Sequence, residues 1–354
     1  MLADLLNSIS VRTPYLVMNK LISSKELPTG HGYEKLKANL LGLKGEARAS
    51  AERDLTSFYQ EQILVGEKAV VLLKSTHEGF RESIIKAFRQ LEIPESEPQK
   101  RFPLYLPQTE LLQLEDTPYL CNVHEDEQYL YVIFSSKRFF TERVEVPLSD
   151  IKDTEKDGYS NYDEIVAVRR HYQQFFDVVS VPKSEGSLEI RVDAPGLMPK
   201  AEINRAVNQI EKELWRLGKN AGLETSTNLE KVNLFPLIDR IYGSSTGSVC
   251  ELGFVTDSGG IKTARMRRFA DDLRNEAYHK AGSQSSEIVP FRIGVRWQRT
   301  SADGLLSNPE LLIPGKFQQL SAPSKENQYH CAVKRCVGLD DYKFVLDKVS
   351  QLIE

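Results

Sequence analysis

Cysteine is scarce in this sequence, which has only Cys121, Cys250, Cys331 and Cys336 among its 354 residues. The four are sparse and lie within runs typical of strands, so they do not resemble the dense cysteine framework of a small secreted domain. A chain of this length can bury a large core without a disulfide or a metal. We therefore expect free, buried thiols and a reducing, cytoplasmic location.

Long apolar runs are also missing. No run approaches the roughly 20 residues that a membrane-spanning helix needs, and no basic segment follows Met1. The charges are nearly balanced, with 46 Lys and Arg against 50 Asp and Glu and a net charge of −4. This balance excludes a general attraction to nucleic acid or to anionic lipid, so any such contact needs a local patch. The sequence predicts no membrane partner.

The amounts of hydrophobic (40%) and charged (27%) residues are typical of a globular protein. Strands paired in hairpins, with helices between them, favour an α+β class. We expect a helical N-terminal region and a small α/β unit over residues 1–150. A C-terminal α+β domain on a mainly antiparallel sheet should follow over 165–354, with the polar segment 150–164 as a linker or long loop.

The first half contains helical and strand-like patterns. A helix is expected over 46–64, a strand buried on both faces over 69–73, and a helix over 78–91. Strands 128–134 and 143–146 are expected to form a hairpin that turns at Ser135–Arg138. Further along, Val168, Tyr172 and Phe176 recur every four residues, which predicts the buried stripe of a helix. Whether the N-terminal helices read DNA stays open.

The second half has clearer patterns. Its best helix is expected over 200–217, where apolar residues recur at intervals of four and three, and Gly218 is its expected end. The other expected strands are 176–181, 188–192, 249–255, 291–297 and 330–337, and the other expected helices are 263–279 and 340–353.

A glycine-rich segment between the strand at 249–255 and the helix expected from 263 is the candidate site. Adjacent glycines let backbone amides converge, and a helix N-terminus adds further N–H groups, so the pattern favours a bound phosphate. It is not a Walker loop, because Ile261 separates the second glycine from the lysine. The residues expected to bind are Gly259, Gly260, Lys262, Thr263, Arg265, Arg267 and Arg268.

Two further arginines extend this site. Arg292 and Arg296 alternate with apolar residues in the strand 291–297, so they share one face of it. A basic sheet face is one way to hold a nucleic-acid backbone. The alternative is a solvent-exposed face on which glutamates neutralise these arginines.

Catalytic and metal signatures are lacking. There is no G-x-S-x-G motif, and the histidines lie scattered. Glu189 and Asp193 share a strand face, but a rise of about 13 Å separates them, too far for one metal ion. A compact carboxylate motif around Glu251 and Asp257 is not evident either. We therefore expect no metal and no cofactor, and no catalytic residue can be assigned.

The leading hypothesis is a non-enzymatic nucleic-acid-binding protein that works as a subunit of a larger assembly. Its expected partners are nucleic acid and other protein subunits, including further copies of the same chain. One alternative is a scaffold subunit that contacts only proteins. Another is an enzyme acting on a phosphorylated small molecule or on nucleic acid.

Overall fold

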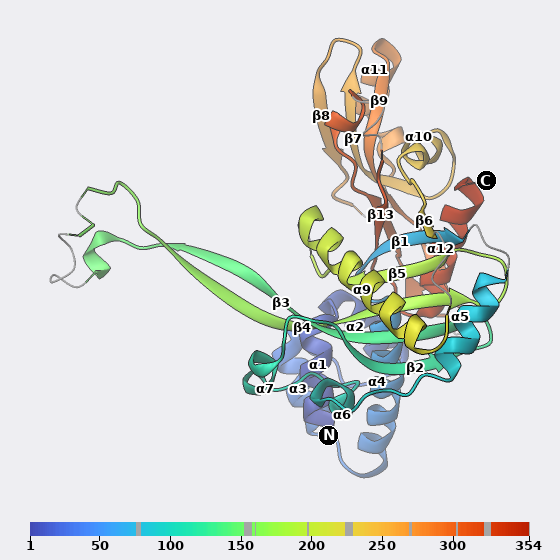
Figure 1. The fold of residues 1–354 in the computed structure, drawn as a ribbon. Coiled ribbons are helices and arrows are strands. Elements are labelled where there is room, and N and C mark those ends of the chain that lie inside the picture. The colour runs from blue at the N-terminus through green and yellow to red at the C-terminus, as the bar shows by residue number, and fades with distance from the viewer. Residues whose placement is uncertain are drawn as a thin grey trace.

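The computed structural model describes residues 1–75, 79–151, 158–159, 161–196, 198–223, 229–268, 271–301, 304–321 and 327–353 (Figure 1). Within them, no helix is long and apolar enough to cross a membrane.

A single large sheet organises the described part of the chain. Its eleven strands follow the order β2-β3-β4-β5-β1-β13-β12-β9-β7-β8, with β6 also pairing β1, and each of these pairs is antiparallel. A separate two-stranded ribbon joins β10 to β11. The strands are β1 (Lys68–Ser75), β2 (Tyr119–Glu125), β3 (Tyr129–Glu145), β4 (Val166–Pro182), β5 (Leu188–Asp193), β6 (Leu229–Lys231), β7 (Ser248–Thr256), β8 (Ile261–Arg265), β9 (Ile288–Arg296), β10 (Arg299–Thr300), β11 (Leu306–Ser307), β12 (Glu310–Ile313) and β13 (His330–Lys334).

Helices lie on both faces of this sheet. They are α1 (Leu2–Arg12), α2 (Tyr15–Ser24), α3 (Gly32–Leu41), α4 (Gly45–Val65), α5 (Phe80–Arg89), α6 (Glu97–Arg101), α7 (Gln108–Gln113), α9 (Lys200–Asn220), α10 (Pro236–Gly243), α11 (Ala277–Ser285) and α12 (Leu339–Ile353), with short 3-10 turns η1 (Leu148–Asp150), η2 (Leu273–Asn275) and η3 (Phe317–Gln319). The α+β class, the helical N-terminus and the mainly antiparallel sheet are thereby confirmed.

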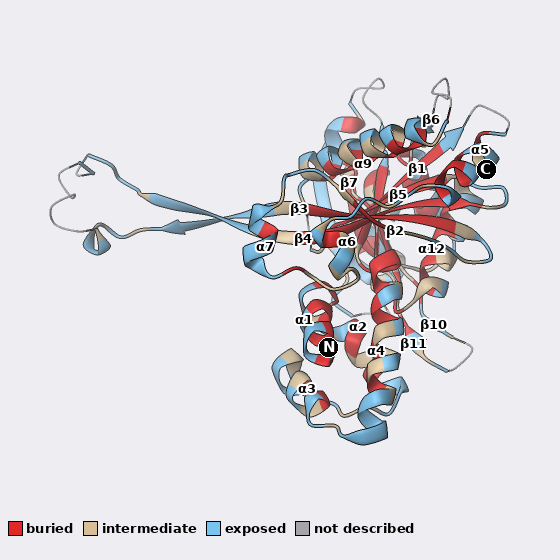
Figure 2. Cartoon of the chain, turned by 60° about the horizontal axis from the view of Figure 1, so that its bottom comes forward, coloured by how far each residue is buried: buried red, intermediate tan, exposed pale blue. Residues whose placement is uncertain are grey.

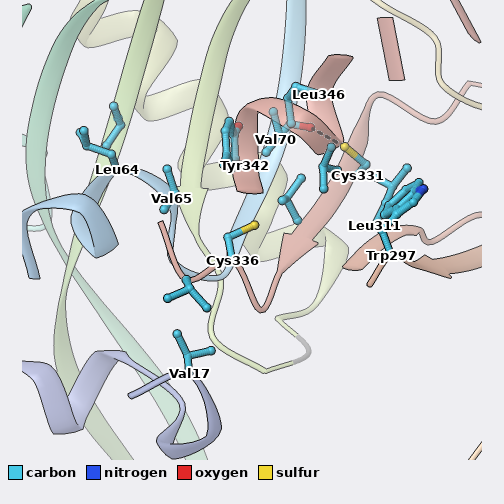
Figure 3. Close-up of a cluster of buried hydrophobic side chains, with 14 of the residues drawn as sticks. Val17, Leu64, Val65, Val70, Trp297, Leu311, Cys331, Cys336, Tyr342 and Leu346 are labelled. Atoms are coloured by element: carbon cyan, nitrogen blue, oxygen red, sulfur yellow. Dashed lines mark hydrogen bonds between the residues drawn. The ribbon is translucent and has the colours of Figure 1, made fainter. Parts of the chain in front are cut away.

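Two hydrophobic cores form because β1 is apolar on both faces. Val70 and Leu72 face a core that contains the N-terminal helices, α10 and α12. Val71 and Leu73 face a second core under α5 and α9. Figure 3 shows the first core, where side chains of α4, β13 and α12 meet. The apolar run at 69–73 is therefore a central strand, as expected.

β1 also joins strands from distant parts of the chain, because it pairs with β5 on one side and β13 on the other. Strands from 1–150 and from 165–354 thus belong to one sheet. The division into two units at these residues stays a prediction.

The β3–β4 hairpin differs from the hairpin expected from the sequence. Ser135–Arg138 is not a turn, because β3 continues through it to Glu145. Val168, Tyr172 and Phe176 lie in the strand β4 and not in a helix. Residues four apart share a face in a strand as well as in a helix, so their spacing did not separate the two.

This hairpin extends far beyond the sheet as a two-stranded arm (Figure 1). In the described residues, β3 has no other partner than β4 beyond Ser135, and β4 has no other partner than β3 before Val178. We call residues 139–145 and 166–172 the arm. We call the buried residues of the same two strands, 130–136 and 174–182, the root. Figure 2 shows the two strands changing from buried in the root to exposed along the arm.

Candidate functional site

The glycine-rich segment forms the turn of the β7–β8 hairpin, so the helix expected over 263–279 is wrong. β8 follows the turn, and the only α-helix among the described residues of that range begins at Ala277. The amide of Gly259 donates to the Thr256 carbonyl (2.8 Å) and that of Gly260 to the Thr256 hydroxyl (3.0 Å). Gly259 has φ +81°, a conformation that favours glycine. Both amides therefore make hydrogen bonds within the turn, and their binding of a phosphate stays a prediction.

Glu251 neutralises two of the predicted arginines. Its carboxylate accepts hydrogen bonds from Arg265 and Arg292, which flank it on β8 and β9. Burial alone would raise the pKa of Glu251, but the two arginines outweigh it and hold the pKa below its ordinary value. The structure thus brings Arg265 and Arg292 together around an acidic side chain.

Arg296 is held in the same way. Its Nε donates to Glu310 at 2.7 Å, and Arg335 lies 3.5 Å from the same carboxylate. Glutamates therefore partner arginines on this face of the sheet, which was the alternative considered from the sequence.

The predicted cations of β8 do not share one face of the strand. Lys262 and Arg265 are three residues apart in β8, so they point to opposite faces, while Arg267 and Arg268 follow the strand end. Thr263 is exposed and lies opposite Gly253. Lys262, Arg267 and Arg268 have no acidic partner in the described residues. Lys262 lies on β8, the last strand of the sheet, and Arg267 and Arg268 follow that strand, so we call these three residues the basic sheet edge.

A buried charged cluster around Asp193 was not predicted. Asp193 forms ion pairs with Arg12 of α1 and Lys68 of β1, and it accepts a hydrogen bond from the Phe176 amide at 2.8 Å. Burial lowers the pKa of Lys68 to about 7, with Arg12 adding to the shift and Asp193 opposing it. These charges fix α1, β1, β4 and β5 together.

Asp177 extends this cluster to the base of the arm. It accepts hydrogen bonds from the Asp193 amide (2.9 Å), from Ser136 (2.7 Å) and from Arg138 (2.9 Å). The Arg138 guanidinium also stacks 4.1 Å from the ring centre of Phe175. Arg138 is therefore the last anchored side chain of β3 before the arm begins.

The arm exposes apolar side chains on both of its faces. Phe139, Val166 and Val168 lie on one face, with 36%, 42% and 60% of their surfaces exposed. Phe140 and Val144 lie on the other, with 38% and 51% exposed. Isolated exposed apolar residues are ordinary, but five gathered on one projecting ribbon are not, so the arm is a further candidate site. The sequence signal for it was the segment 139–145, whose apolar residues fit no buried stripe.

The cysteines and the groups that could bind a metal were the remaining features considered from the sequence. All four cysteines are free and buried, as expected, and burial raises the pKa of Cys331 to about 12. No group of His, Cys, Asp and Glu that could hold a metal occurs among the described residues. Glu189, considered above with Asp193, is bound to Arg191 and Tyr342.

No protein-family model, curated protein or solved structure matches this chain.

Proposed function

We propose that this protein is an assembly protein that binds another protein chain through its β-ribbon arm. The observation that carries the proposal is the exposure of five large apolar side chains on both faces of a ribbon that has no core of its own. A two-stranded ribbon is marginally stable in water, so a partner chain would order it as well as cover it.

The backbone of the arm supports the same proposal. Along Phe139–Glu145 and Val166–Tyr172 each strand pairs only with the other among the described residues. Each therefore has an outer edge, where alternate N–H and C=O groups face solvent. Such edges accept an added strand from another chain, and apolar neighbours strengthen the contact.

Photo-crosslinking tests the proposal directly. Phe140 is replaced by benzoylphenylalanine in the full chain, which is irradiated in the cells that make it. We expect a crosslink to a second protein chain, identified by mass spectrometry. The same replacement at Val289, which is 46% exposed on β9, is the matched control. Crosslinking from 140 no stronger than from 289 would contradict the proposal.

Nucleic-acid binding is the second candidate function. It is favoured by the basic sheet edge, where Lys262, Arg267 and Arg268 have no acidic partner in the described residues. Gel-shift titrations with short DNA and RNA at two salt concentrations test it. Replacing the three cations by alanine should reduce the log–log salt slope by about 3, because each phosphate contact releases counterions. An absence of retention at low salt would remove this candidate.

A further inference from the structure

A cleft of about 730 Å³ lies between α4, β2 and the start of α12. Phe58 and Leu64 of α4 form part of its apolar lining, and Leu305 and Leu339 add to it from across the cleft. It is large enough to take several side chains of another chain.

The polar lining of this cleft is acidic. Among the described residues it contains five carboxylates, those of Asp54, Glu61, Asp126, Asp340 and Asp341, and one lysine, Lys25. Three of the five have partners within the chain. Glu61 accepts the Leu339 amide at 3.0 Å, Asp126 accepts the Tyr131 hydroxyl at 3.0 Å, and Asp341 pairs with Arg299.

The other two carboxylates, Asp54 and Asp340, have no hydrogen-bond or ion-pair partner in the described residues. A partly apolar cleft with two available carboxylates suits an occupant that is both apolar and cationic.

The arm has this complementary chemistry. Its cations are Arg143, Arg169 and Arg170, against Glu142 and Glu145, and Glu142 already contacts His171. Arg143 and Arg169 form no ion pair in the described part of the chain, and Arg170 lies over the Phe139 ring at 4.9 Å. Because apolar side chains project from both faces, the arm is suited to insertion between two walls and not to lying on a flat surface.

We propose that the arm of one copy inserts into the acidic cleft of a second copy, so that two chains exchange arms. This inference rests on the proposed function and names its partner. Arginines of the arm approach Asp54 and Asp340, while its apolar side chains meet the lining from α4. The contact is isologous, so two arms and two clefts are buried at once.

Paired charge reversals test the exchange by sedimentation velocity of the full chain. The arm variant carries Arg143→Glu, Arg169→Glu and Arg170→Glu, and the cleft variant carries Asp54→Lys and Asp340→Lys. Wild type should sediment at twice the 40.2 kDa chain mass. Each variant alone should associate about 100-fold more weakly, because like charges then meet. Asp239→Lys, on an exposed side of α10, is the control and should leave association unchanged.

Mixing the two variants gives the sharper result. The intact cleft of the arm variant can accept the intact arm of the cleft variant, so the mixture should recover dimer. Thermal unfolding confirms that each variant is folded. If the arm variant lost association but the cleft variant associated as wild type does, the cleft would be overturned as the receptor and the proposed function would stand. A wild-type monomer together with a crosslink from 140 to a different protein would likewise overturn only this inference. A monomer without that crosslink would overturn both.

Discussion

The two strands of the β3–β4 ladder pass through two very different environments. At the root, residues 130–136 and 174–182 are buried between the two cores. In the arm, residues 139–145 and 166–172 continue the same antiparallel register, and all but the half-buried Tyr172 are exposed. Backbone pairing is the same in both parts, so it does not explain why the arm projects from the sheet. The two parts differ in the burial of their side chains.

Side-chain anchoring changes at the same point. The root is held by Asp193 and Asp177, which bind groups of α1, β1, β3 and β4, whereas no arm residue reaches the body of the protein through a described ion pair. Burial and ion pairs therefore hold the root in the body of the protein, whereas neither holds the arm there in the described residues. Four predictions test this difference, from the largest expected effect on stability to the smallest.

Asp193→Asn should lower the free energy of unfolding by about 3–5 kcal/mol, because it leaves Arg12 and Lys68 buried without their counter-charge. Urea denaturation measures the loss. The matched control is Glu145→Gln in the arm, which removes an exposed carboxylate and should have almost no effect. Equal losses of unfolding free energy in the two variants would mean that the root and the arm contribute alike to stability.

The pH dependence of stability should report Lys68. Its pKa is lowered to about 7 in the folded protein, while an unfolded lysine titrates near about 10.4. Between these values the unfolded chain binds more protons, so stability should rise with pH, by at most about 1.4 kcal/mol per unit. Lys68→Met should lack this rise when the two unfolding curves are compared from pH 7 to 10. Parallel curves would show that Lys68 keeps an ordinary pKa.

Arg138→Met should destabilise the protein by about 2 kcal/mol, because it removes one charged hydrogen bond to Asp177 and another to the Asp193 carbonyl at the end of the root. Thermal unfolding checks the value. Asp177 keeps its bonds from Ser136 and the Asp193 amide, so the effect should be smaller than that of Asp193→Asn. If Arg138→Met destabilised the protein as much as Asp193→Asn, the root would extend further along β3.

Val168→Ser should change stability by less than about 0.5 kcal/mol, since the side chain is 60% exposed and contributes little to either core. It should nevertheless weaken crosslinking from position 140 to a partner chain. A large loss of stability would show that the arm packs within its own chain.

Much of the fold was predictable from local pattern. The helix expected over 200–217 appears as Lys200–Asn220, and the apolar run at 69–73 is the central strand. The intervals of three and four residues over 200–217 fit a helix, and the short continuous run at 69–73, with Val70 and Val71, fits a strand buried on both faces. The exposed arm was missed because its apolar residues do not face a core, so they have no period that separates inside from outside.

The candidate site was less predictable. The turn at Gly259 and Gly260 was located correctly between two elements, but the element after it, which contains Lys262 and Arg265, is a strand. Basic residues at a helix start oppose the helix dipole, which was a local signal against the expected helix. The Asp193 cluster could not be found locally, because Arg12 and Lys68 lie 181 and 125 residues away in sequence.

Hydrogen exchange of the arm amides tests the central claim most directly. Wild-type protein is separated into monomeric and assembled fractions, and exchange is followed over residues 139–145 and 166–172. An isolated ribbon should exchange rapidly in the monomer, because its hydrogen bonds are solvent-exposed and its local stability is low. We predict strong protection of these amides in the assembled fraction, with the root at 130–136 protected in both. Equal, rapid exchange of the arm in both fractions would contradict the claim that it binds another chain.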